Sequence, residues 1–413
     1  MNLKLSHSAN PIDASVVITG SKSETNRLLI LEALFDGITI ENLSNSDDAS
    51  VMQKALASSN ERVDIHHAGT AMRFLTAYFA VQPGRNTLLT GSNRMQERPI
   101  GVLVDALRSL GAHIDYEANE GYPPLRILGQ QLSKSTVSLK ADVSSQYISA
   151  LMLIGASLPK GLEITLEGKI TSVPYITMTL ALLQQLGIQG SFTGQTIQIQ
   201  PLANALAQQP IIVESDWSSA SYFYSIVALV PGSSITLSSY RQESLQGDAV
   251  LQKIYQALGV TTVFDGVNMS LTSASKGDLV DSLELDLSRS PDIAQTIAVT
   301  CLGLGIGCHL TGLHTLKIKE TDRLEALKTE IRKLGGAISV TNNSLTLEPQ
   351  KEPLRSDVSI ATYNDHRMAM AFAPLAVKTP IQIEDAGVVS KSYPDFWSDL
   401  KMLDFEVQSI INA

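Results

Sequence analysis

Cysteine, long apolar runs and net positive charge are all scarce in this chain of 413 residues. Its two cysteines, Cys301 and Cys308, lie in one apolar stretch, which excludes a disulfide framework and is typical of a reducing compartment. No apolar run is long enough to span a membrane, and the first residues lack the apolar core of a signal peptide. These absences predict a cytoplasmic protein that contacts no membrane.

The shortage of positive charge limits the partners of this chain. Its 31 basic and 41 acidic residues give a net charge of −10. A surface for nucleic acid needs a basic face, so this balance predicts no nucleic-acid partner. An acidic protein that binds anions must gather its cations locally, and the positions of Lys and Arg therefore become informative.

The sequence contains an internal repeat. A helix end of the form apolar-x-x-Leu-Gly recurs at Gly111, Gly187, Gly259 and Gly335, which are 76, 72 and 76 residues apart, and a degenerate copy ends at Asp404. Each of these glycines suits the left-handed position that ends a helix. Loops that open apolar helices recur at a similar spacing, apart from a shorter first interval of 47 residues between Ser23 and Thr70. The spacing predicts about six α/β copies that pack together.

The helices of these copies are expected to lie inside a wall of short strands. Segments such as 147–154 and 294–299 are apolar on every face, which is typical of buried helices. A division into two halves is expected near residues 213–215, after a polar stretch. The fold class predicted from the residues is therefore α/β, with buried helices surrounded by strands.

The segment Gly20–Arg27 is the first candidate site. It follows a short β-like run and opens an apolar helix with two serines, a lysine and an arginine. A helix start offers free N–H groups and partial positive charge, which suit a phosphate or carboxylate. The alternative is a well-capped helix with two solvated cations. The spacing of a nucleotide P-loop is missing.

Further cations lie on the recurring loops and helix starts. Each one alone fits an exposed ion pair or a surface loop equally well. If the copies pack around one axis, however, these loops face a common cleft that binds more than one anionic group. Eight cations are candidates for its lining: Lys22, Arg27, Arg73, Arg98, Lys319, Arg323, Arg367 and Lys391.

Two carboxylates, Asp292 and Glu320, stand among these cations. One interpretation is helix capping and charge balance, because Asp is a favoured cap. The other is general acid and base chemistry on a bound polyanion. Their spacing in the sequence is compatible with both.

The motifs that carry these residues resemble those of a known family, in the family's order and across nearly the whole chain. They are Gly20–Arg27, Gly69–Arg73, Arg98–Pro99, Ser144–Gln146, Pro291–Asp292, Lys319–Arg323 and Asn364–Met370. Together they resemble the 5-enolpyruvylshikimate-3-phosphate (EPSP) synthases, which are 3-phosphoshikimate 1-carboxyvinyltransferases. The resemblance implies two similar domains, each of three βαβαββ copies, in an inside-out α/β barrel. It places residues 1–18 with 215–413 in one domain, on the phosphoenolpyruvate side, and residues 19–214 in the other, on the shikimate 3-phosphate side, with the active site in the cleft.

The resemblance also implies an activity, a shikimate-pathway step. The enolpyruvyl group of phosphoenolpyruvate passes to the 5-hydroxyl of shikimate 3-phosphate by addition and elimination, and phosphate leaves. The implied enzyme is a monomer without a metal or organic cofactor. The residues implied for shikimate 3-phosphate are Lys22, Ser23, Arg27, Ser144, Ser145, Gln146, Ser172, Tyr175, Asp292 and Lys319. Those implied for phosphoenolpyruvate are Lys22, Gly69, Arg98, Gln146, Arg323, Arg367 and Lys391. Asp292 is the expected base, and Glu320 the expected acid, assisted by Lys22 or His366.

Three residues depart from the family's usual pattern: His67 replaces an asparagine, Phe74 a proline and Thr315 an asparagine. Two other functions compete with this one. The sister enzyme that acts on a UDP-linked amino sugar commonly carries a catalytic cysteine near Arg98, and no cysteine lies there. A repeat scaffold that binds anionic partners predicts cations scattered over the outer surface, whereas the enzyme predicts that they converge.

Overall fold

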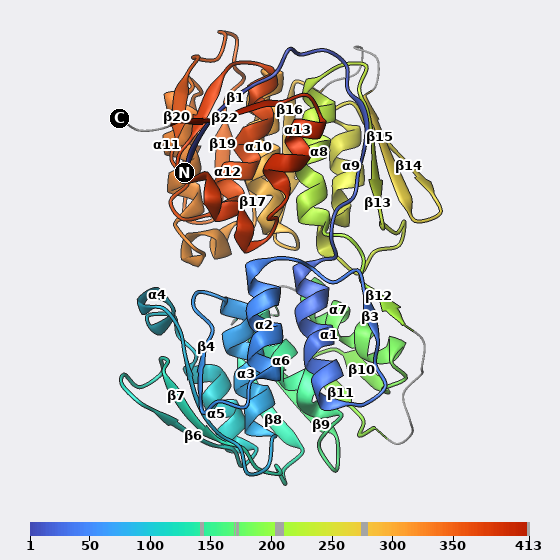
Figure 1. The fold of residues 1–413 in the computed structure, drawn as a ribbon, viewed down its shortest axis with the longest axis vertical. Helices are drawn as coiled ribbons and strands as arrows, with labels where there is room; N and C mark the ends of the chain where they lie inside the picture. Colours follow the sequence, from blue (N-terminus) through green and yellow to red (C-terminus); the bar gives the residue numbers. More distant parts are fainter. Residues whose placement is uncertain (141–143, 169, 171–172, 203–209, 274–279, 411–413) are drawn as a thin grey trace. The chain divides into compact units, whose positions relative to one another are not determined.

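The computed structural model describes residues 1–413 except 141–143, 169, 171–172, 203–209, 274–279 and 411–413. The chain divides into two compact units, called unit 1 (Met1–Thr19 with Glu214–Ala413) and unit 2 (Gly20–Val213). Each boundary lies one residue from the position expected from the resemblance. Figure 1 shows both units, with the two ends of the chain in unit 1.

Unit 2 alternates short strands with helices. Its elements are α1 (Lys22–Leu34), β3 (Ile40–Glu41), α2 (Asp47–Ala57), β4 (Arg62–Asp64), α3 (Gly69–Ala80), β5 (Asn86–Thr90), α4 (Asn93–Gln96), α5 (Gly101–Ser109), β6 (His113–Tyr116), β7 (Leu125–Leu128), β8 (Thr136–Lys140), α6 (Ser145–Gly155), β9 (Leu162–Glu167), α7 (Val173–Gln185), β10 (Gly190–Thr193), β11 (Thr196–Ile199) and β12 (Ile211–Ile212).

Unit 1 follows the same order of elements, with several 3₁₀ turns labelled η. It contains β1 (Asn2–Ser6), β2 (Asp13–Val16), α8 (Trp217–Leu229), β13 (Ser234–Ser238), η1 (Gly247–Val250), α9 (Leu251–Gln256), β14 (Val260–Asp265), β15 (Asn268–Ser273), β16 (Ser282–Asp286), η2 (Pro291–Ile293), α10 (Ala294–Leu304), β17 (Gly307–Thr311), η3 (His314–Ile318), α11 (Arg323–Lys333), β18 (Ile338–Val340), β19 (Leu345–Leu347), β20 (Val358–Ile360), α12 (His366–Phe372), η4 (Ala373–Val377), β21 (Ile381–Ile383), η5 (Ala386–Lys391), α13 (Phe396–Met402) and β22 (Glu406–Ile410).

The described strands form six sheets, and five of them share one topology. In β4-β5-β7-β6, for example, β4 and β5 run parallel, while β7 pairs antiparallel with both β5 and β6. The same pattern recurs in β8-β9-β11-β10, β2-β13-β15-β14, β16-β17-β19-β18 and β20-β21-β1-β22. This is the βαβαββ copy that the repeat and the resemblance predicted. The sheets stay separate, so the described strands form no closed barrel.

The remaining copy, the first along the chain, is incomplete. Within the described residues its sheet consists of β3 and β12, which pair in parallel. No hairpin follows α2, and the chain passes directly into β4 of the next copy. The expected six copies are therefore present as five four-stranded sheets and one shorter sheet among the described residues, and the absence of a hairpin between α2 and β4 explains why the first interval of the repeat is short.

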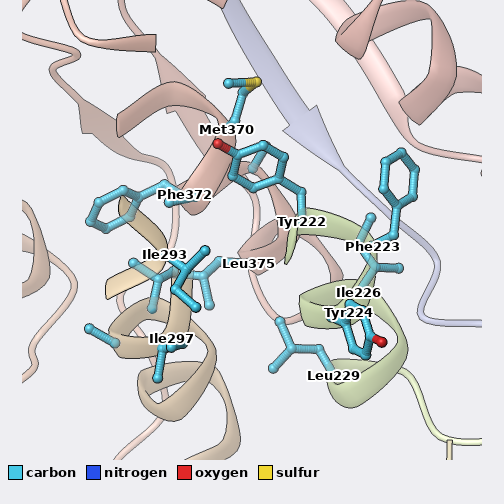
Figure 2. Close-up of a cluster of buried hydrophobic side chains, with 14 of the residues drawn as sticks. Tyr222, Phe223, Tyr224, Ile226, Leu229, Ile293, Ile297, Met370, Phe372 and Leu375 are labelled. Carbon is cyan, nitrogen blue, oxygen red and sulfur yellow. The ribbon is translucent and has the colours of Figure 1, made fainter. Parts of the chain in front are cut away.

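The hydrophobic core of unit 1 lies between helices that are buried on every side. Figure 2 shows Tyr222 and Leu229 of α8, Ile297 of α10 and Leu375 of η4 within this cluster, and all four are buried. Gly303 of α10 permits the close packing, because a Cβ there would lie 2.6 Å from Leu229 Cδ2 and 2.8 Å from Leu375 Cδ2. The predicted buried helices are confirmed at α6 and α10, whose residues are almost all buried.

The recurring helix ends have the predicted left-handed backbone. The φ angles are 107° at Gly111, 84° at Gly187, 80° at Gly259 and 102° at Gly335, and Asp404 of the degenerate copy has φ 61°. Glycine adopts this region without a steric penalty, which is why it recurs at these positions. Among the described residues, no helix has both the length and the apolar character needed to cross a membrane.

Candidate functional site

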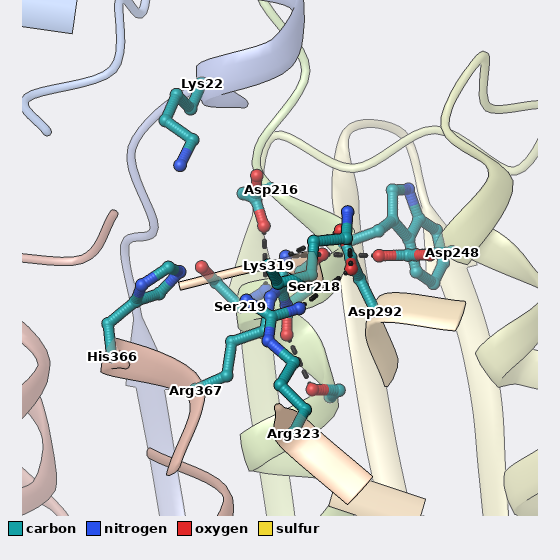
Figure 3. A network of polar contacts seen from close by, with 12 residues as sticks. Lys22, Asp216, Ser218, Ser219, Asp248, Asp292, Lys319, Arg323, His366 and Arg367 are labelled. Carbon is teal, nitrogen blue, oxygen red and sulfur yellow. Dashed lines mark hydrogen bonds and ion pairs between the residues drawn. The ribbon is translucent and has the colours of Figure 1, made fainter. Parts of the chain in front are cut away.

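An ion network gathers the predicted site residues of unit 1 at the starts of three helices. Asp292 lies in η2 just before α10, Arg323 is the first residue of α11, and Arg367 lies in the first turn of α12. Lys319 and Glu320 precede α11 in the chain. Figure 3 shows the side chains of Asp292, Lys319, Arg323 and Arg367 converging. The predicted convergence is therefore present within this unit.

Arg323 is the centre of the network. Its side chain is 2% exposed, and it donates from Nε to Asp365 Oδ2 (2.6 Å), from Nη1 to Asp292 Oδ1 (2.9 Å) and from Nη2 to Glu320 Oε2 (2.8 Å). Burial alone would lower the pKa of the Arg323 guanidinium, but the three carboxylates raise it above its ordinary value. Arg323 is therefore a permanent cation.

Asp292 is surrounded by three cations. Besides Arg323, Lys319 Nζ lies 3.4 Å from its Oδ1, and Arg367 Nη2 lies 3.4 Å from its Oδ2. Burial would raise the pKa of Asp292, but Lys319, Arg367 and Arg323 hold it well below its usual range. The carboxylate is thus ionised in the free protein.

Glu320 lies at the more open edge of the network, with a side chain 32% exposed. Burial would raise its pKa, but the charges of Arg323, His366 and Lys319 lower it well below the usual value. His366 is almost fully buried, and its Nδ1 lies 3.8 Å from Asp365 Oδ1. Of the residues expected to transfer protons in this unit, Asp292 and Glu320 thus contact Arg323 directly, and His366 lies beside Asp365, which itself pairs with Arg323.

Asp365 links two helices. One of the sequence motifs contains it, but no role was predicted for this residue. One oxygen accepts from the backbone N–H of Arg367 (2.9 Å) and so caps α12, while the other accepts from Arg323. The chain reaches this position through Tyr363 and Asn364, with φ 54° and 56°. An Asp just before the first residue of an apolar helix was the signal that could have identified it.

The turn that presents Asp365 is held by a buried glutamate. Glu330 of α11 accepts hydrogen bonds from the Tyr363 hydroxyl (2.7 Å) and the Ala361 backbone N–H (3.2 Å), and it pairs with Lys333 (2.7 Å). Two left-handed residues in succession cost energy, so these contacts keep the turn in place. Helix α11 thus fixes the turn at Glu330 and the network at Arg323.

Ser218 and Asp248 support Arg367 from the side of α8 and η1. Ser218, at the start of α8, accepts a hydrogen bond from Arg367 Nη2 (3.2 Å) and donates to Asp248. Burial, followed by the charges of Asp292 and Asp216, raises the pKa of Asp248 to about 6, against the opposing effect of Arg367. Sequence reasoning missed Asp248, because no motif marks a carboxylate in a 3₁₀ turn.

Lys391 lies outside the unit 1 network, although it was assigned with the other cations. Its Nζ donates to the backbone carbonyl of Asn364 at 2.7 Å. It therefore contacts the turn before Asp365 rather than the carboxylates.

In unit 2, Arg27 occupies a different environment. Its guanidinium is 3% exposed and donates to Thr179 Oγ1 (2.8 Å), Ser149 Oγ (3.1 Å) and the Ser23 carbonyl (2.7 Å). The rings of Phe74 and Tyr175 flank it, with centroids 5.4 and 5.8 Å from Cζ. Burial lowers the pKa of Arg27 to about 10, against the charges of Tyr175 and Glu24, which raise it.

The start of α3 lies against Arg98. A Cβ at Gly69 would be 2.6 Å from Arg98 Nη1, so a side chain here would displace the end of Arg98. Arg73, one turn into α3, is buried and donates to the carbonyls of Gly69 (3.1 Å) and Pro99 (3.2 Å). Burial, and then the nearby charge of Arg98, lowers the pKa of Arg73 to about 10. Arg98 and Arg73 thus concentrate positive charge beside an open helix start.

The remaining predicted residues of unit 2 lie at other helix starts. Lys22 is the first residue of α1, and its Nζ is 3.7 Å from Asp48 Oδ2, a contact that sequence reasoning missed. Ser144 caps α6 and is followed by Ser145 and Gln146, whose amide donates to Thr70 Oγ1 (3.1 Å). Ser172 lies outside the described residues. In the described part of the chain, no His, Cys, Asp or Glu cluster is arranged to hold a metal ion.

Comparisons with known proteins agree on one family. The family model for EPSP synthase (3-phosphoshikimate 1-carboxyvinyltransferase) matches residues 52–400. A 3-phosphoshikimate 1-carboxyvinyltransferase of Bacteroides fragilis is 48% identical over 401 residues, covering 96% of this chain and 97% of that protein. One from Shewanella sediminis is 34% identical over 423 residues, covering 95% and 97%.

Solved structures share the fold. An EPSP synthase from Acinetobacter baumannii superposes with a TM-score of 0.82 at 20% identity, covering 99% of this chain and 100% of that one. The enolpyruvyl transferase NikO of Streptomyces tendae matches with a TM-score of 0.73 at 16% identity, covering 98% of each chain. These similarities extend over both units, and together with the relatives they show that this chain belongs to the EPSP synthase (3-phosphoshikimate 1-carboxyvinyltransferase) family.

Proposed function

We propose that this chain transfers the enolpyruvyl group of phosphoenolpyruvate to the 5-hydroxyl of shikimate 3-phosphate and releases phosphate, as a step of the shikimate pathway. The observation that carries the proposal is the ionised Asp292 held among Lys319, Arg323 and Arg367. A base surrounded by cations suits the removal of a proton next to phosphate groups. Membership of the family supports the same reaction.

The residues proposed for shikimate 3-phosphate offer hydroxyls and cations at helix starts. Arg27 suits the ring carboxylate, because the groups that hold its guanidinium, the Thr179 and Ser149 hydroxyls and the Ser23 carbonyl, are neutral. Ser144 and Ser145 suit the phosphate at the start of α6. The full set is Lys22, Ser23, Arg27, Ser144, Ser145, Gln146, Ser172, Tyr175, Asp292 and Lys319.

The residues proposed for phosphoenolpyruvate supply positive charge to its phosphate and carboxylate. Arg98 lies beside Gly69, whose lack of a Cβ leaves its backbone accessible. Arg367 pairs with Asp292 at 3.4 Å in the free protein. The full set is Lys22, Gly69, Arg98, Gln146, Arg323, Arg367 and Lys391.

Substrate binding is expected to change the strength of the base. With its pKa held low, Asp292 is ionised but is a weak base. The phosphate of a bound substrate attracts Lys319 and Arg367, and this competition weakens their hold on Asp292 and raises its pKa. Asp292 then accepts the 5-hydroxyl proton while the hydroxyl oxygen attacks C2 of phosphoenolpyruvate.

The second proton transfer is proposed for Glu320, which accepts from the other terminal nitrogen of Arg323. Glu320 protonates C3 of phosphoenolpyruvate, with Lys22 or His366 assisting, and the tetrahedral adduct then expels phosphate. In the free protein Arg323 keeps Glu320 ionised. An acid role therefore requires that the substrate's anionic groups reduce the effect of Arg323 and raise the pKa of Glu320.

We further propose that the enzyme acts in the cytoplasm as a monomer that binds no nucleic acid. The net charge of −10 supports the last point, because a nucleic-acid surface would need a basic face.

The proposal is tested by phosphate release from phosphoenolpyruvate in the presence of shikimate 3-phosphate. Asp292→Asn keeps the shape of the side chain and removes its basicity, so kcat should fall by about 10²- to 10⁴-fold. Asp265→Asn, at the exposed end of β14 in the same unit, is the matched control and should retain wild-type turnover. Wild-type protein that releases no phosphate would refute the activity, and a fully active Asp292→Asn would refute the role of Asp292.

A further inference from the structure

Two hydroxyl groups occupy one edge of the Arg27 guanidinium. Nε donates to Thr179 Oγ1 at 2.8 Å and Nη2 donates to Ser149 Oγ at 3.1 Å. These two nitrogens form the side-on fork that a carboxylate commonly binds with both oxygens. Here two neutral oxygens from separate helices, α6 and α7, take that place.

The two hydroxyls are themselves fixed. Thr179 Oγ1 donates to the Tyr175 carbonyl at 2.7 Å, and the hydroxyl oxygens of Ser149 and Thr179 lie 2.9 Å apart. Both residues have 0% exposure. The pair is therefore rigid and dry, and it fixes the plane of the Arg27 guanidinium.

This arrangement leaves the rest of Arg27 available to a ligand. A guanidinium has five N–H groups, and three of them bind Thr179, Ser149 and the Ser23 carbonyl. The other two are on Nη1 and Nη2, the pair of nitrogens that an end-on carboxylate binds. The two hydroxyls are neutral, so they orient Arg27 without cancelling its charge. Burial lowers the pKa of Arg27, against the charges of Tyr175 and Glu24, which raise it.

We infer that Ser149 and Thr179 are positioning residues, which hold the Arg27 guanidinium so that its two terminal nitrogens receive the carboxylate of shikimate 3-phosphate. This inference rests on the proposed function of the chain. Neither residue contacts the substrate in this account, and both act through Arg27. A carboxylate in their place would position Arg27 equally well but would neutralise it.

Thr179→Val is the principal test, because it removes the hydroxyl and keeps the shape of the side chain. We expect the Kd and KM of shikimate 3-phosphate to rise about tenfold, since a hydrogen bond that orients a charged donor is lost. The KM of phosphoenolpyruvate should not change. Thr179→Ser should restore wild-type affinity, and the methyl ester of the ring carboxylate should bind wild type and Thr179→Val equally.

Thr177→Val is the matched control. Thr177 lies on the same helix α7, is exposed, and donates to a backbone carbonyl at 3.0 Å as Thr179 does. Circular dichroism and Tm show whether each variant folds, and Ser149→Ala tests the second hydroxyl independently. Unchanged affinity in both Thr179→Val and Ser149→Ala would overturn the inference, as would an equal loss in Thr177→Val.

A thermodynamic cycle shows whether the effect passes through Arg27. In an Arg27→Lys background, calorimetry should find that Thr179→Val no longer changes the Kd of shikimate 3-phosphate. A full effect in that background would overturn the inference.

A measurement without substrate separates this inference from the proposed function. The Arg27 Nε–H resonance, assigned by its loss in Arg27→Lys, should exchange faster with water in Thr179→Val and not in Thr177→Val. If wild-type protein does not bind shikimate 3-phosphate, the proposed function fails, while this resonance still reports on the hydroxyl pair. An unchanged resonance in Thr179→Val would show that the pair does not hold Arg27.

Discussion

Arg323 and Arg27 are both buried arginines at predicted sites, yet their surroundings differ in charge. Arg323 of unit 1 contacts three carboxylates, which raise its pKa. Arg27 of unit 2 contacts two hydroxyls and a carbonyl, and burial lowers its pKa to about 10. The first arginine organises acidic groups, whereas the second keeps its charge for a ligand.

The difference extends to the neighbouring cations. Lys319 and Arg367 also pair with Asp292, so the three cations of the unit 1 network face three carboxylates, namely Asp292, Glu320 and Asp365. In the described part of unit 2, Arg73 and Arg98 form no ion pair. An incoming anion must therefore compete with protein carboxylates at the unit 1 network and with Asp48 at Lys22, whereas at Arg73 and Arg98 it meets no such ion pair among the described residues.

The largest expected difference concerns stability. Arg323→Met leaves three carboxylates close together without their shared partner, and we expect a loss of about 3–5 kcal/mol in the free energy of unfolding. Urea denaturation of the full chain measures it. Arg94→Met, at the exposed pair with Glu97 (3.0 Å), is the control and should cost at most about 1 kcal/mol. Equal losses in the two variants would show that the network does not stabilise unit 1.

A smaller effect is expected at Asp248, whose pKa burial raises from 3.8 to about 6. Between those values the folded protein binds more protons than the unfolded chain, so this residue lowers stability as pH rises through the window. The cost, at most about 3 kcal/mol, is fully present above about pH 6. Asp248→Asn should abolish it.

Urea midpoints at pH 4 and pH 7 measure this effect. The variant should gain stability relative to wild type between the two values. A parallel pH dependence in the two proteins would contradict the raised pKa of Asp248.

The smallest effect on stability is expected at Arg27. Arg27→Met removes a buried cation whose three hydrogen-bond acceptors are neutral, and Ser149 and Thr179 retain their mutual hydrogen bond at 2.9 Å. The free energy of unfolding should therefore change by less than about 1.5 kcal/mol. Affinity for shikimate 3-phosphate should nevertheless fall strongly in calorimetry. A destabilisation as large as that of Arg323→Met would remove the distinction between the two arginines.

Most of the architecture could be predicted because its signals are local. The helix ends at Gly111 and Gly335 follow from the left-handed backbone that glycine favours, and the buried helices follow from apolar residues on every face. The incomplete first copy could not be predicted, because strand pairing between β3 and β12 joins residues about 170 positions apart. The short first interval of the repeat can be seen in the sequence, but the missing hairpin that causes it cannot.

The candidate site was predicted unevenly for the same reason. The motifs contain Asp292, Glu320, Arg323 and Arg367, which the structure gathers. Asp248 and Thr179 carry no motif and join their arginines only through tertiary packing. Lys391 has a motif, yet it contacts a backbone carbonyl rather than the network.

The sequence by itself determined the repeat, the positions of helix starts and ends, and which cations and carboxylates the chain offers, because each depends on short-range backbone preference or on residue identity. Only the tertiary structure decided which charged or neutral groups contact each cation. Ion pairing and burial depend on distances of a few ångströms between segments far apart in the chain. That is why Arg323 is surrounded by carboxylates and Arg27 by hydroxyls, although both arginines occur in similar-looking motifs at the start of a helix.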